Sequence, residues 1–303
     1  MSQDKVRVQV DGRDLTLTNL DKVLYPRAGF TKGEVIDYYS RVADALLPHL
    51  RGRPLTRKRW PDGVDGPFFF EKNVPRGTPD WVRTVRLPVP GSTKDRETVD
   101  FVLVDDLATL VWTANLAALE LHTPQWQVGP RGAVKDPDLL VIDLDPGPPA
   151  GLAECTQAAC RIRDRLAEDG LTAYPKTSGN KGMQLCVPVS GKQGSAVVSD
   201  YAHRIARELE AAHPEEMLSR MTKALRPGKV FLDWSQNNAA KTTVAPYSLR
   251  GREEPTVSTP LTWAEVEAGK PLRFRPGDVL ARVAEHGDLL EPLLERGPRV
   301  PAS

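Results

Sequence analysis

The chain has 303 residues, enough for one large domain or two modest ones. Its 41 Lys and Arg residues nearly cancel its 40 Asp and Glu residues, so bulk charge gives no sign of a nucleic-acid-binding protein, although local basic clusters still could. Three cysteines without a CxxC pair argue against a structural zinc site and a disulfide framework, and the lack of a long apolar run predicts a soluble, intracellular protein that does not enter membranes.

The first half of the chain carries signals for a hairpin and two helices. The alternating stretch VRVQV ends at Asp11-Gly12, which predicts a β-hairpin with the following LTLTN. Thr31 and Glu34 have the spacing of a capping box and predict the start of a helix. Apolar residues at helical spacing predict a second helix over about residues 106–121.

In the second half, helical and strand patterns alternate, which favours an α/β or α+β fold. Helices are expected at about 152–168 and 199–212, and strands at 139–144, 171–175, 183–189, 229–234 and 242–248. A soft boundary lies near residue 130, in the stretch GPRG. The residues after Leu290 are typical of a fraying end or of a linker to another segment.

Two carboxylates end one of these strands, in the stretch LLVIDLDPG. Because side chains alternate along a strand, Asp143 and Asp145 point the same way with Cα atoms roughly 6.5 Å apart, while Ile142 and Leu144 point into a core. Like charges this close need a cation or a proton between them. Asp233 ends a second short apolar strand, so the pattern predicts a divalent-cation site for phosphoryl transfer. The simpler alternative is a half-exposed strand with solvated aspartates.

Two further elements suit a nucleotide. The stretch TSGNKG lies between two apolar strands and offers backbone N–H groups, Ser178 and Lys181 to a triphosphate, although the spacing is not that of a Walker A loop. The alternative is a plain hairpin turn with a solvated lysine. His122 is placed at the end of the second helix, where its imidazole would face a phosphate or a sugar; a structural histidine is the more common case.

Basic residues gather near aromatic ones. The stretch RGRPLTRKRW has five cations in ten residues and is followed by Phe68-Phe69-Phe70, as in a platform for single-stranded nucleic acid. The pattern slightly favours the alternative, in which the phenylalanines are core and the arginines solvated. Lys22 and Lys32 flank a turn, and Lys32 is in the first turn of the capped helix, where free N–H groups would bind a terminal phosphate. A second basic stretch contains Arg220, Lys223, Arg226, Lys229, Lys241, Arg250 and Arg252.

Eight motifs in one order resemble a known family: DKVLYP, TRKRWP, FFEK, HTPQW, DLDPG, TSGNKG, KVFLDWSQN and KTTVAPYSLRGR. The chain is similar to the polymerase domain of the bacterial non-homologous end-joining ligase D, a branch of the archaeo-eukaryotic primase superfamily, from LTNLDKVLYP to about residue 290. The resemblance implies one compact α/β (α+β) unit in which an RRM-like, antiparallel or mixed catalytic sheet packs against an N-terminal α/β module. It also implies boundaries: a catalytic domain over 1–290, made of an N-terminal module (about 1–130), a catalytic module (about 131–260) and a closing segment (about 261–290), and a tail or linker over 291–303.

The resemblance also implies roles for single residues. The metal-binding catalytic triad would be Asp143, Asp145 and Asp233, of which Asp233 helps to activate the primer 3′-hydroxyl. Contacts to the nucleotide and its triphosphate would come from Lys58, Phe70, His122, Ser178, Lys181, Gln236 and Arg250. Contacts to DNA would come from Lys22 and Lys32 at a downstream 5′-phosphate, Phe69 at the templating strand, and Arg226 in primer and end alignment.

The implied activity is nucleotidyl transfer by a DNA-directed polymerase that uses Mn²⁺ or Mg²⁺. Its substrates would be NTPs in preference to dNTPs, and DNA with a short gap or a 3′ overhang and a downstream 5′-phosphate. It would also add untemplated nucleotides and bridge broken ends, as a monomer or as two copies across a break, in the cytoplasm and on the nucleoid of a bacterium. Because no ligase or phosphoesterase domain follows, partnership with a DNA ligase and with the end-binding protein Ku is an open expectation.

Two other functions remain as alternatives. A haloacid-dehalogenase-type phosphatase also uses two aspartates after an apolar strand, but it asks for Thr or Val where this chain has Gly147, and its aspartates usually lie near the N-terminus. A DNA-end-binding protein without activity could keep the same fold. The presence of all three aspartates, Lys181 and Arg250 argues against it.

Overall fold

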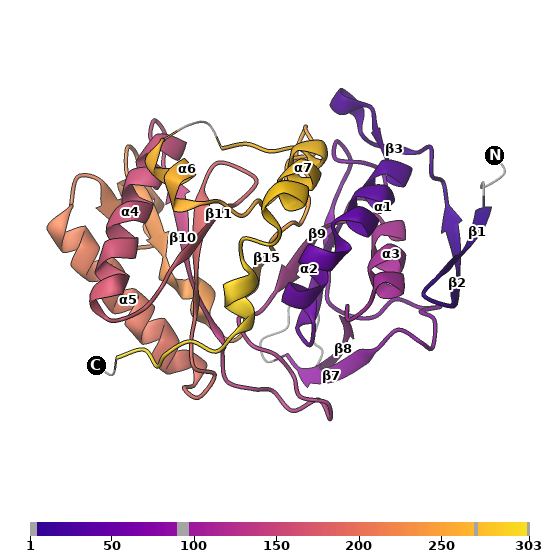
Figure 1. Ribbon diagram of the computed structural model, residues 1–303, viewed down its shortest axis with the longest axis horizontal. Helices are drawn as coiled ribbons and strands as arrows, with labels where there is room; N and C mark the ends of the chain where they lie inside the picture. The colour runs from indigo at the N-terminus through magenta and orange to yellow at the C-terminus, as the bar shows by residue number, and fades with distance from the viewer. Residues whose placement is uncertain (1–4, 90–96, 270–271, 302–303) are drawn as a thin grey trace.

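The computed structural model describes residues 5–89, 97–269 and 272–301. Two sheets lie side by side, each with its own helices: α1 to α3 cover one, and α4 and α5 cover the other (Figure 1). No helix among the described residues has the length and apolarity needed to cross a membrane.

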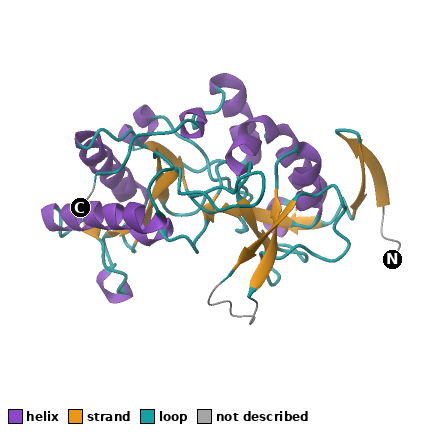
Figure 2. Ribbon diagram, turned by 90° about the horizontal axis from the view of Figure 1, so that it is seen from below, coloured by secondary structure: helices purple, strands orange, loops and turns teal. Residues whose placement is uncertain are grey.

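The N-terminal signals are confirmed. Strands β1 (Lys5–Val10) and β2 (Arg13–Thr18) pair antiparallel around Asp11 and Gly12, whose positive φ angles of 49° and 75° suit a type I′ turn. This hairpin stands at the edge of the molecule (Figure 2). Helix α1 (Lys32–Arg41) begins with the predicted capping box, in which Thr31 and Glu34 exchange side-chain and backbone hydrogen bonds.

The first sheet is antiparallel and has the strand order β15-β9-β5-β8-β7, with β6 paired to β5 as well. Its last strand, β15, comes from the second half of the chain. The elements of this half are β3 (Val23–Tyr25), β4 (Phe30–Thr31), α2 (Ala43–Leu50), β5 (Pro54–Arg59), β6 (Phe69–Glu71), β7 (Thr84–Pro88), β8 (Thr98–Leu103), α3 (Leu107–Asn115) and β9 (Ala118–Thr123), and β15 is Thr243–Val244.

The predicted helix over 106–121 is wrong in its second half. Helix α3 ends at Asn115, and after Ala117, at a positive φ of 56°, the chain continues as strand β9. Residues 118–121 are all buried, because Leu119 and Leu121 pack in the first core and Glu120, on the other face, is covered by Arg250 and Gly251. A strand with no exposed face has no alternating pattern, so its apolar residues could be counted into the preceding helix.

The second sheet has the order β11-β12-β10-β14-β13 and is mixed, since only β13 and β14 run parallel. Helices α4 (Leu152–Glu168) and α5 (Ser195–Ala212) match their predictions closely. The strands are β10 (Leu139–Pro146), β11 (Tyr174–Thr177), β12 (Met183–Pro188), β13 (Met217–Leu218) and β14 (Val230–Asp233). Of the predicted strand 242–248 only β15 is regular, because a turn follows it and Tyr247 has a φ of 63°.

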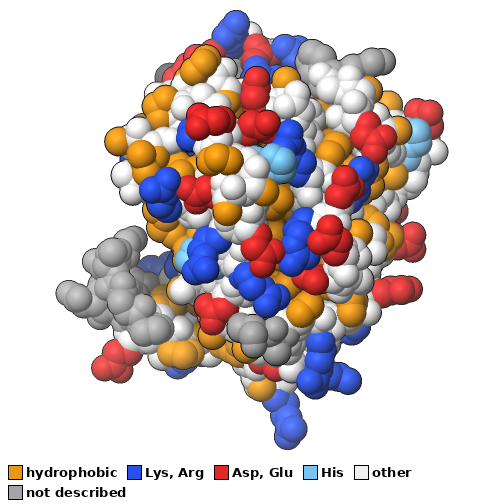
Figure 3. Space-filling model, turned by 90° about the vertical axis from the view of Figure 1, so that its left-hand side faces the viewer, with side chains coloured by type: hydrophobic (Ala, Val, Ile, Leu, Met, Phe, Trp, Pro, Cys, Tyr) orange, Lys and Arg blue, Asp and Glu red, His pale blue; other side chains and the backbone are white. Residues whose placement is uncertain are grey.

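The outer surface of the second half is electrostatically mixed. Helix α4 forms ion pairs through three arginines, with Glu216, Glu267 and Glu208 as partners of Arg161, Arg163 and Arg165. Basic and acidic side chains are interspersed on the end of the molecule that carries α4 and α5 (Figure 3). This end therefore has no large surface of one charge.

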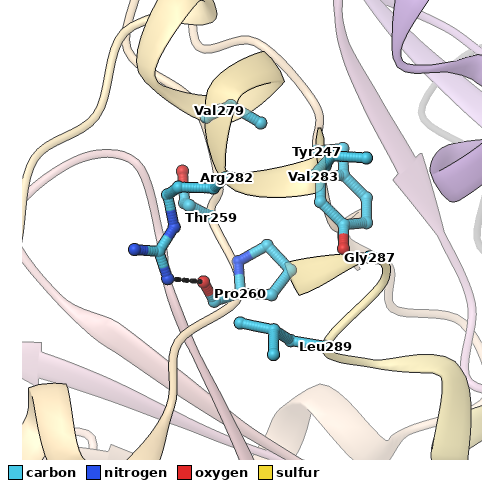
Figure 4. Close-up of a pocket in the computed structure, with 8 residues that line it drawn as sticks. All are labelled: Tyr247, Thr259, Pro260, Val279, Arg282, Val283, Gly287 and Leu289. Atoms are coloured by element: carbon cyan, nitrogen blue, oxygen red, sulfur yellow. Dashed lines mark hydrogen bonds between the residues drawn. The ribbon is translucent and has the colours of Figure 1, made fainter. Parts of the chain in front are cut away.

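The C-terminal segment ties the two halves together. Helices α6 (Trp263–Glu267) and α7 (Pro276–His286) follow the sheets, and Arg282 of α7 donates to the carbonyl of Pro260 beside a small cavity (Figure 4). Asp288 accepts hydrogen bonds from the Tyr247 hydroxyl at 2.6 Å and pairs with His49 of α2 at 2.7 Å. Ala245, Tyr247, Leu249 and Val257 pack in the first core together with residues of the N-terminal half.

The expectation of a fraying end after Leu290 is also wrong for the described residues. Leu293 and Val300 are buried against the second half, and the backbone of Val300 exchanges hydrogen bonds with Gln193. Arg296 pairs with the buried Asp138 at 3.3 Å. Apolar side chains at the very end of a chain remain buried only when another element covers them, which a local sequence pattern does not reveal.

Candidate active site

The three predicted catalytic carboxylates lie on one face of two neighbouring strands. Strand β10 pairs antiparallel with β14 so that Asp143 is directly opposite Asp233, and Asp145 follows two residues later on the same side. The alternate residues Ile142 and Leu144 pack into the core below α4 and α5. Directly opposed residues have Cβ atoms about 5 Å apart, so long-range pairing brings Asp233 next to a carboxylate 90 residues away.

Asp143 is buried close to the negative charges of the other two carboxylates. Burial, together with the negative charges of Asp145 and Asp233, raises the pKa of Asp143 to about 7, although Gln184 donates a hydrogen bond that acts in the opposite direction. Asp145 stands at the rim with a side chain that is 41% exposed, and the guanidinium of Arg226 lies 3.9 Å from it. The repulsion inferred from the sequence is therefore present, and a proton or a cation relieves it.

The donor set suits a hard divalent cation, but the third carboxylate is engaged elsewhere. Asp233 accepts hydrogen bonds from the backbone and hydroxyl of Ser235 and, at 3.0 Å, from the side chain of Gln236. Among the described residues, no three His, Cys, Asp or Glu side chains are grouped as ligands of one ion would be. Three carboxylates and no nitrogen or sulfur donor fit Mg²⁺ or Mn²⁺, and each oxygen of Asp233 keeps a lone pair beside these hydrogen bonds.

The Pro-Gly sequence after the aspartates positions a neighbouring loop. An ideal Cβ on Gly147 would lie 2.1 Å from the carbonyl oxygen of Arg226, so only glycine lets the two backbones meet. The backbone N–H of Gly147 donates to Lys229, and Gly228 donates back to Gly147. The loop that carries Arg226 is thereby fixed beside Asp145.

Replacing Gly147 with alanine is expected to displace this loop, destabilise the protein by roughly 1–3 kcal/mol and lower the activity of the site, because the added methyl group overlaps backbone. Urea denaturation and an activity assay measure the two effects. The control is Gly277→Ala in α7, where no described atom lies within 4 Å of the new Cβ and which should leave both unchanged. Equal behaviour of the two variants would contradict the packing argument.

The TSGNKG segment lies against the end of the catalytic strand. Ser178 accepts from the backbone N–H groups of Asn180 and Gly182, and Lys181 donates to the carbonyl of Pro146 at 3.1 Å. Arg250 donates to the backbone carbonyl of Ser178. A hydroxyl, an ammonium and a guanidinium thus surround a tight turn within contact of the residue that follows Asp145, an arrangement suited to an anion.

His122 lies on a strand rather than at a helix end. Its neighbour across β5 is Thr56, and two residues earlier Glu120 is opposite Lys58, which is in turn opposite Phe70 of β6. The His122 ring contacts the Phe70 ring edge to face, with centroids 6.1 Å apart. The expected helix-terminal position is thus wrong, but the strand brings three of the predicted nucleotide residues into one row.

The favoured interpretation of the phenylalanines as core is wrong. Phe69 and Phe70 are 42% and 53% exposed, and Phe68 is exposed as well. Arg57 is fully buried instead and pairs with Glu71, and Arg59 pairs with Glu71 and stacks on Phe69. Solvent-facing rings beside cations match the nucleic-acid platform that the sequence offered as the other interpretation.

The same rings open onto a groove of about 750 Å³. Phe69 and Phe70 line one side, and Trp126, Lys72 and Lys241 contribute further aromatic and basic side chains. Lys241 also contacts Ser235, the hydrogen-bond partner of Asp233. The groove therefore extends from the aromatic platform to Lys241, which is linked to Asp233 through Ser235.

Lys22 and Lys32 are close enough to influence each other. Burial, Lys22 and Arg59 lower the pKa of Lys32 to about 8. The Lys32 ammonium donates to the backbone carbonyl and the hydroxyl of Thr18, and Lys22 pairs with Asp62 at 2.9 Å. The expected free N–H groups at the start of α1 are not available, because those of Lys32, Gly33 and Glu34 donate to Lys22, Leu20 and Thr31.

Two buried ionisable residues of the site were missed by the sequence analysis. Glu120 lies beneath His122, and its position two residues away on a strand was hidden by the assignment of this segment to a helix. Lys176 of β11 is only 2% exposed and donates to Gln184, Ser258 and the carbonyl of Val244. Its partners are far apart in the sequence, so no local motif signals it.

Comparison with known proteins places these features in a family. Residues 31–290 match the family model described as LigD, primase-polymerase domain. The chain is 45% identical over 92% of its length to the multifunctional non-homologous end joining protein LigD of Mycobacterium bovis, and 35% identical over 90% of its length to the bifunctional LigD of Bacillus subtilis. It spans only 37% and 43% of those two proteins.

A solved structure gives the same result for the fold. The polymerase domain of Mycobacterium tuberculosis ligase D, determined in complex with DNA, superposes with a TM-score of 0.88 at 45% identity. The superposition covers 92% of this chain and 98% of that domain. The mixed α/β fold is therefore that of the ligase D polymerase domain.

Proposed function

Because the chain belongs to the LigD primase-polymerase domain family, we propose that it is a nucleotidyltransferase that extends a DNA primer in the repair of broken DNA. The observation that carries this proposal is the alignment of Asp143, Asp145 and Asp233 on two paired strands, next to an anion-binding turn and an exposed aromatic platform. Templated nucleotidyl transfer uses these three parts together: carboxylates for cations, donors for a triphosphate and a surface for the template.

The carboxylates would hold Mn²⁺ or Mg²⁺. When bound, such ions supply charge stabilisation to the transferring phosphoryl group and lower the pKa of the attacking hydroxyl. Without a cation, burial and the two neighbouring carboxylates raise the pKa of Asp143. Asp145 would be the accessible ligand at the rim, and Asp233 is held in place by Ser235 and Gln236. Asp233 would receive the proton of the primer 3′-hydroxyl, a role for which an ionised carboxylate is suited.

The triphosphate would lie between the TSGNKG turn and the row on β5 and β9. Ser178, Lys181 and Arg250 provide one side, and His122 and Lys58 the other. Phe69 and Phe70 would stack on the template and on the incoming base, since exposed rings gain stacking energy without reading sequence. Arg226, fixed next to Asp145 by Gly147, would align the primer end.

The proposed function also includes a DNA substrate, a nucleotide preference and a repair pathway. DNA with a short gap or a 3′ overhang and a downstream 5′-phosphate would be the polymer substrate, NTPs would be preferred to dNTPs, and the pathway would be non-homologous end joining. Ku and a DNA ligase are the partners that this pathway supplies. The named activities of the relatives agree with this setting, and the chain corresponds to little more than a third of the mycobacterial protein.

Purified protein is expected to extend a primer across a short gap with Mn²⁺ and to incorporate NTPs more readily than dNTPs. A side-by-side assay of all four NTPs and dNTPs, with Mn²⁺, with Mg²⁺ and with EDTA, measures both claims. DNA binding without any incorporation would instead support the non-catalytic end-binding alternative. Hydrolysis of a phosphomonoester without incorporation would favour the phosphatase alternative.

A further inference from the structure

We propose that Glu120 is the positioning residue of the triphosphate subsite, because one buried carboxylate gathers the side chains of Lys58, His122 and Arg250 before a nucleotide arrives. The inference rests on the proposed function, in which these three residues contact the triphosphate. It assigns Glu120 no contact with the nucleotide itself.

Four groups from separate parts of the chain converge on Glu120. Its side chain is only 1% exposed, and its Oε2 is 2.8 Å from His122 Nε2. Its Oε1 accepts from the backbone N–H of Gly251 at 3.1 Å and lies 3.3 Å from Arg250 Nε and 3.8 Å from Lys58 Nζ. These groups come from β9, from the loop after β15 and from β5, so Glu120 links the strand row to the loop that reaches Ser178.

The Glu120 carboxylate and the basic groups of Lys58, His122 and Arg250 stabilise one another. Burial alone would raise the pKa of Glu120, but His122, Arg250 and Lys58 lower it to about 2, so the carboxylate is ionised at every working pH. The cations of Lys58 and Arg250 would repel each other, burial lowers the pKa of His122, and a buried carboxylate without partners would be costly. Together they form a preorganised set of donors, which loses little freedom when a triphosphate binds.

Glu120 also determines which ring nitrogen of His122 carries the proton. Since Glu120 accepts from Nε2–H, the neutral ring carries its proton on Nε2, and Nδ1 gains a proton only when the ring becomes an imidazolium. The charged groups that face His122 are Glu120 on its own strand, Lys58 on β5 and Arg250 from the loop; β6 contributes the uncharged Phe70 ring. A bound triphosphate adds negative charge on the far side of the ring and so favours the imidazolium, which Glu120 stabilises.

An amide cannot replace this carboxylate. Both oxygens of Glu120 are acceptors, one for Gly251 and one for His122, whereas a glutamine side chain has a single acceptor oxygen. Glu120→Gln therefore keeps an acceptor for Gly251 but offers His122 an amide donor in place of an acceptor, which pairs only with a ring protonated on Nδ1 and not with the imidazolium, and it removes the charge. Glu120→Asp keeps both acceptors and the charge but withdraws them by one methylene.

The test is gap filling with Mn²⁺ by the parent, Glu120→Gln and Glu120→Asp from pH 6 to pH 8.5, together with direct binding of a fluorescent NTP without DNA. We expect Glu120→Gln to raise the KM for NTP about tenfold or more and to change kcat about threefold or less, because the catalytic carboxylates are untouched. In the parent, affinity for NTP should fall as pH rises and the imidazolium is lost, and the variant should show a flatter profile. Glu120→Asp should recover part of the affinity.

Two controls separate positioning from general damage. Asp138→Asn removes another buried carboxylate that pairs with two arginines, Arg53 and Arg296, and should lower thermal stability without changing the KM for NTP. His122→Ala added to Glu120→Gln should raise KM less than His122→Ala does in the parent, since the two residues act as a unit. If Glu120→Gln unfolds the protein, the KM for NTP, the pH profile and the coupling with His122→Ala are measured with Glu120→Asp instead.

The outcomes distinguish this inference from the proposed function. A parent that binds NTP but extends no primer would overturn the polymerase function, while the binding measurements would still test Glu120. A parent that extends primers, with Glu120 variants of parental KM and pH profile, would overturn the positioning role alone. Additive effects of the Glu120 and His122 substitutions would overturn it too.

Discussion

Asp143→Asn is expected to abolish primer extension and, without divalent cations, to make the protein more stable than the parent at pH 8. Asparagine keeps the size of a neutral carboxyl group but supplies no charge to a cation, so activity should fall by more than about 10³-fold. It also removes one charge from the repulsion with Asp145 and Asp233. DNA binding should be retained, because the aromatic platform and the lysines near α1 are unchanged.

The stability gain should depend on pH in a defined direction. The pKa of Asp143 is raised from an ordinary value near 4 to about 7 in the folded protein. A raised pKa means that the favourable contribution of the protonated group is complete below about pH 4 and is lost as pH rises through 7. The parent therefore carries a penalty at pH 8 that the variant avoids, on the order of 2–4 kcal/mol.

Thermal unfolding in EDTA at pH 5 and pH 8 measures this difference, and primer extension measures the catalytic loss. Added Mn²⁺ should stabilise the parent more than the variant, since only the parent holds the full ligand set. Asp138→Asn is the matched control: it leaves the buried Arg53 without its counter-charge and should destabilise the protein at both pH values. A variant that extends primers at a rate within tenfold of the parent would contradict the catalytic role of Asp143.

Replacing both Lys22 and Lys32 with alanine should erase the preference for a downstream 5′-phosphate over a 5′-hydroxyl. The two ammonium groups lie close enough to lower the pKa of Lys32, and a phosphate dianion would offset that repulsion. Two charge-assisted contacts are worth roughly 3 kcal/mol, so the discrimination should drop by about 100-fold. Binding of gapped DNA with and without the phosphate, followed by fluorescence anisotropy, measures the ratio.

This preference should weaken above pH 8 in the parent. Burial and the neighbouring cations lower the pKa of Lys32 to about 8, so its ammonium is lost at pH 9, whereas a phosphomonoester is a dianion from pH 7 upward. Affinity for the phosphorylated end should therefore fall with pH while affinity for the unphosphorylated end stays constant. Lys192→Ala with Arg207→Ala removes the same charge from the α5 side of the molecule and should leave the ratio intact. A Lys22 and Lys32 double variant that keeps the parental ratio of the two affinities would contradict the role of these residues at the downstream 5′-phosphate.

The sequence by itself determined the features that local physics controls. The hairpin at Asp11-Gly12, the capping box at Thr31 and helix α4 follow from backbone preferences and apolar spacing within a few residues. The shared face of Asp143 and Asp145 follows from the alternation of a strand, and the motifs together indicated the family. These signals are short in range, so no knowledge of the neighbours was needed to interpret them.

Tertiary structure decided the features in which distant segments meet. Both faces of strand β9 are covered, one by the first core and the other by the loop of Arg250 and Gly251, so the strand has no exposed face and Glu120 stayed hidden beside His122. The exposure of Phe69 and Phe70, and the burial of Arg57, depend on which face of β5 and β6 the rest of the first sheet leaves uncovered. The pairing of β14 with β10 set Asp233 against Asp143, and the C-terminal residues pack because the second half provides a surface for them. Whether a side chain is buried depends on the distant segment that covers it as much as on its own segment. The local sequence pattern therefore could not predict it.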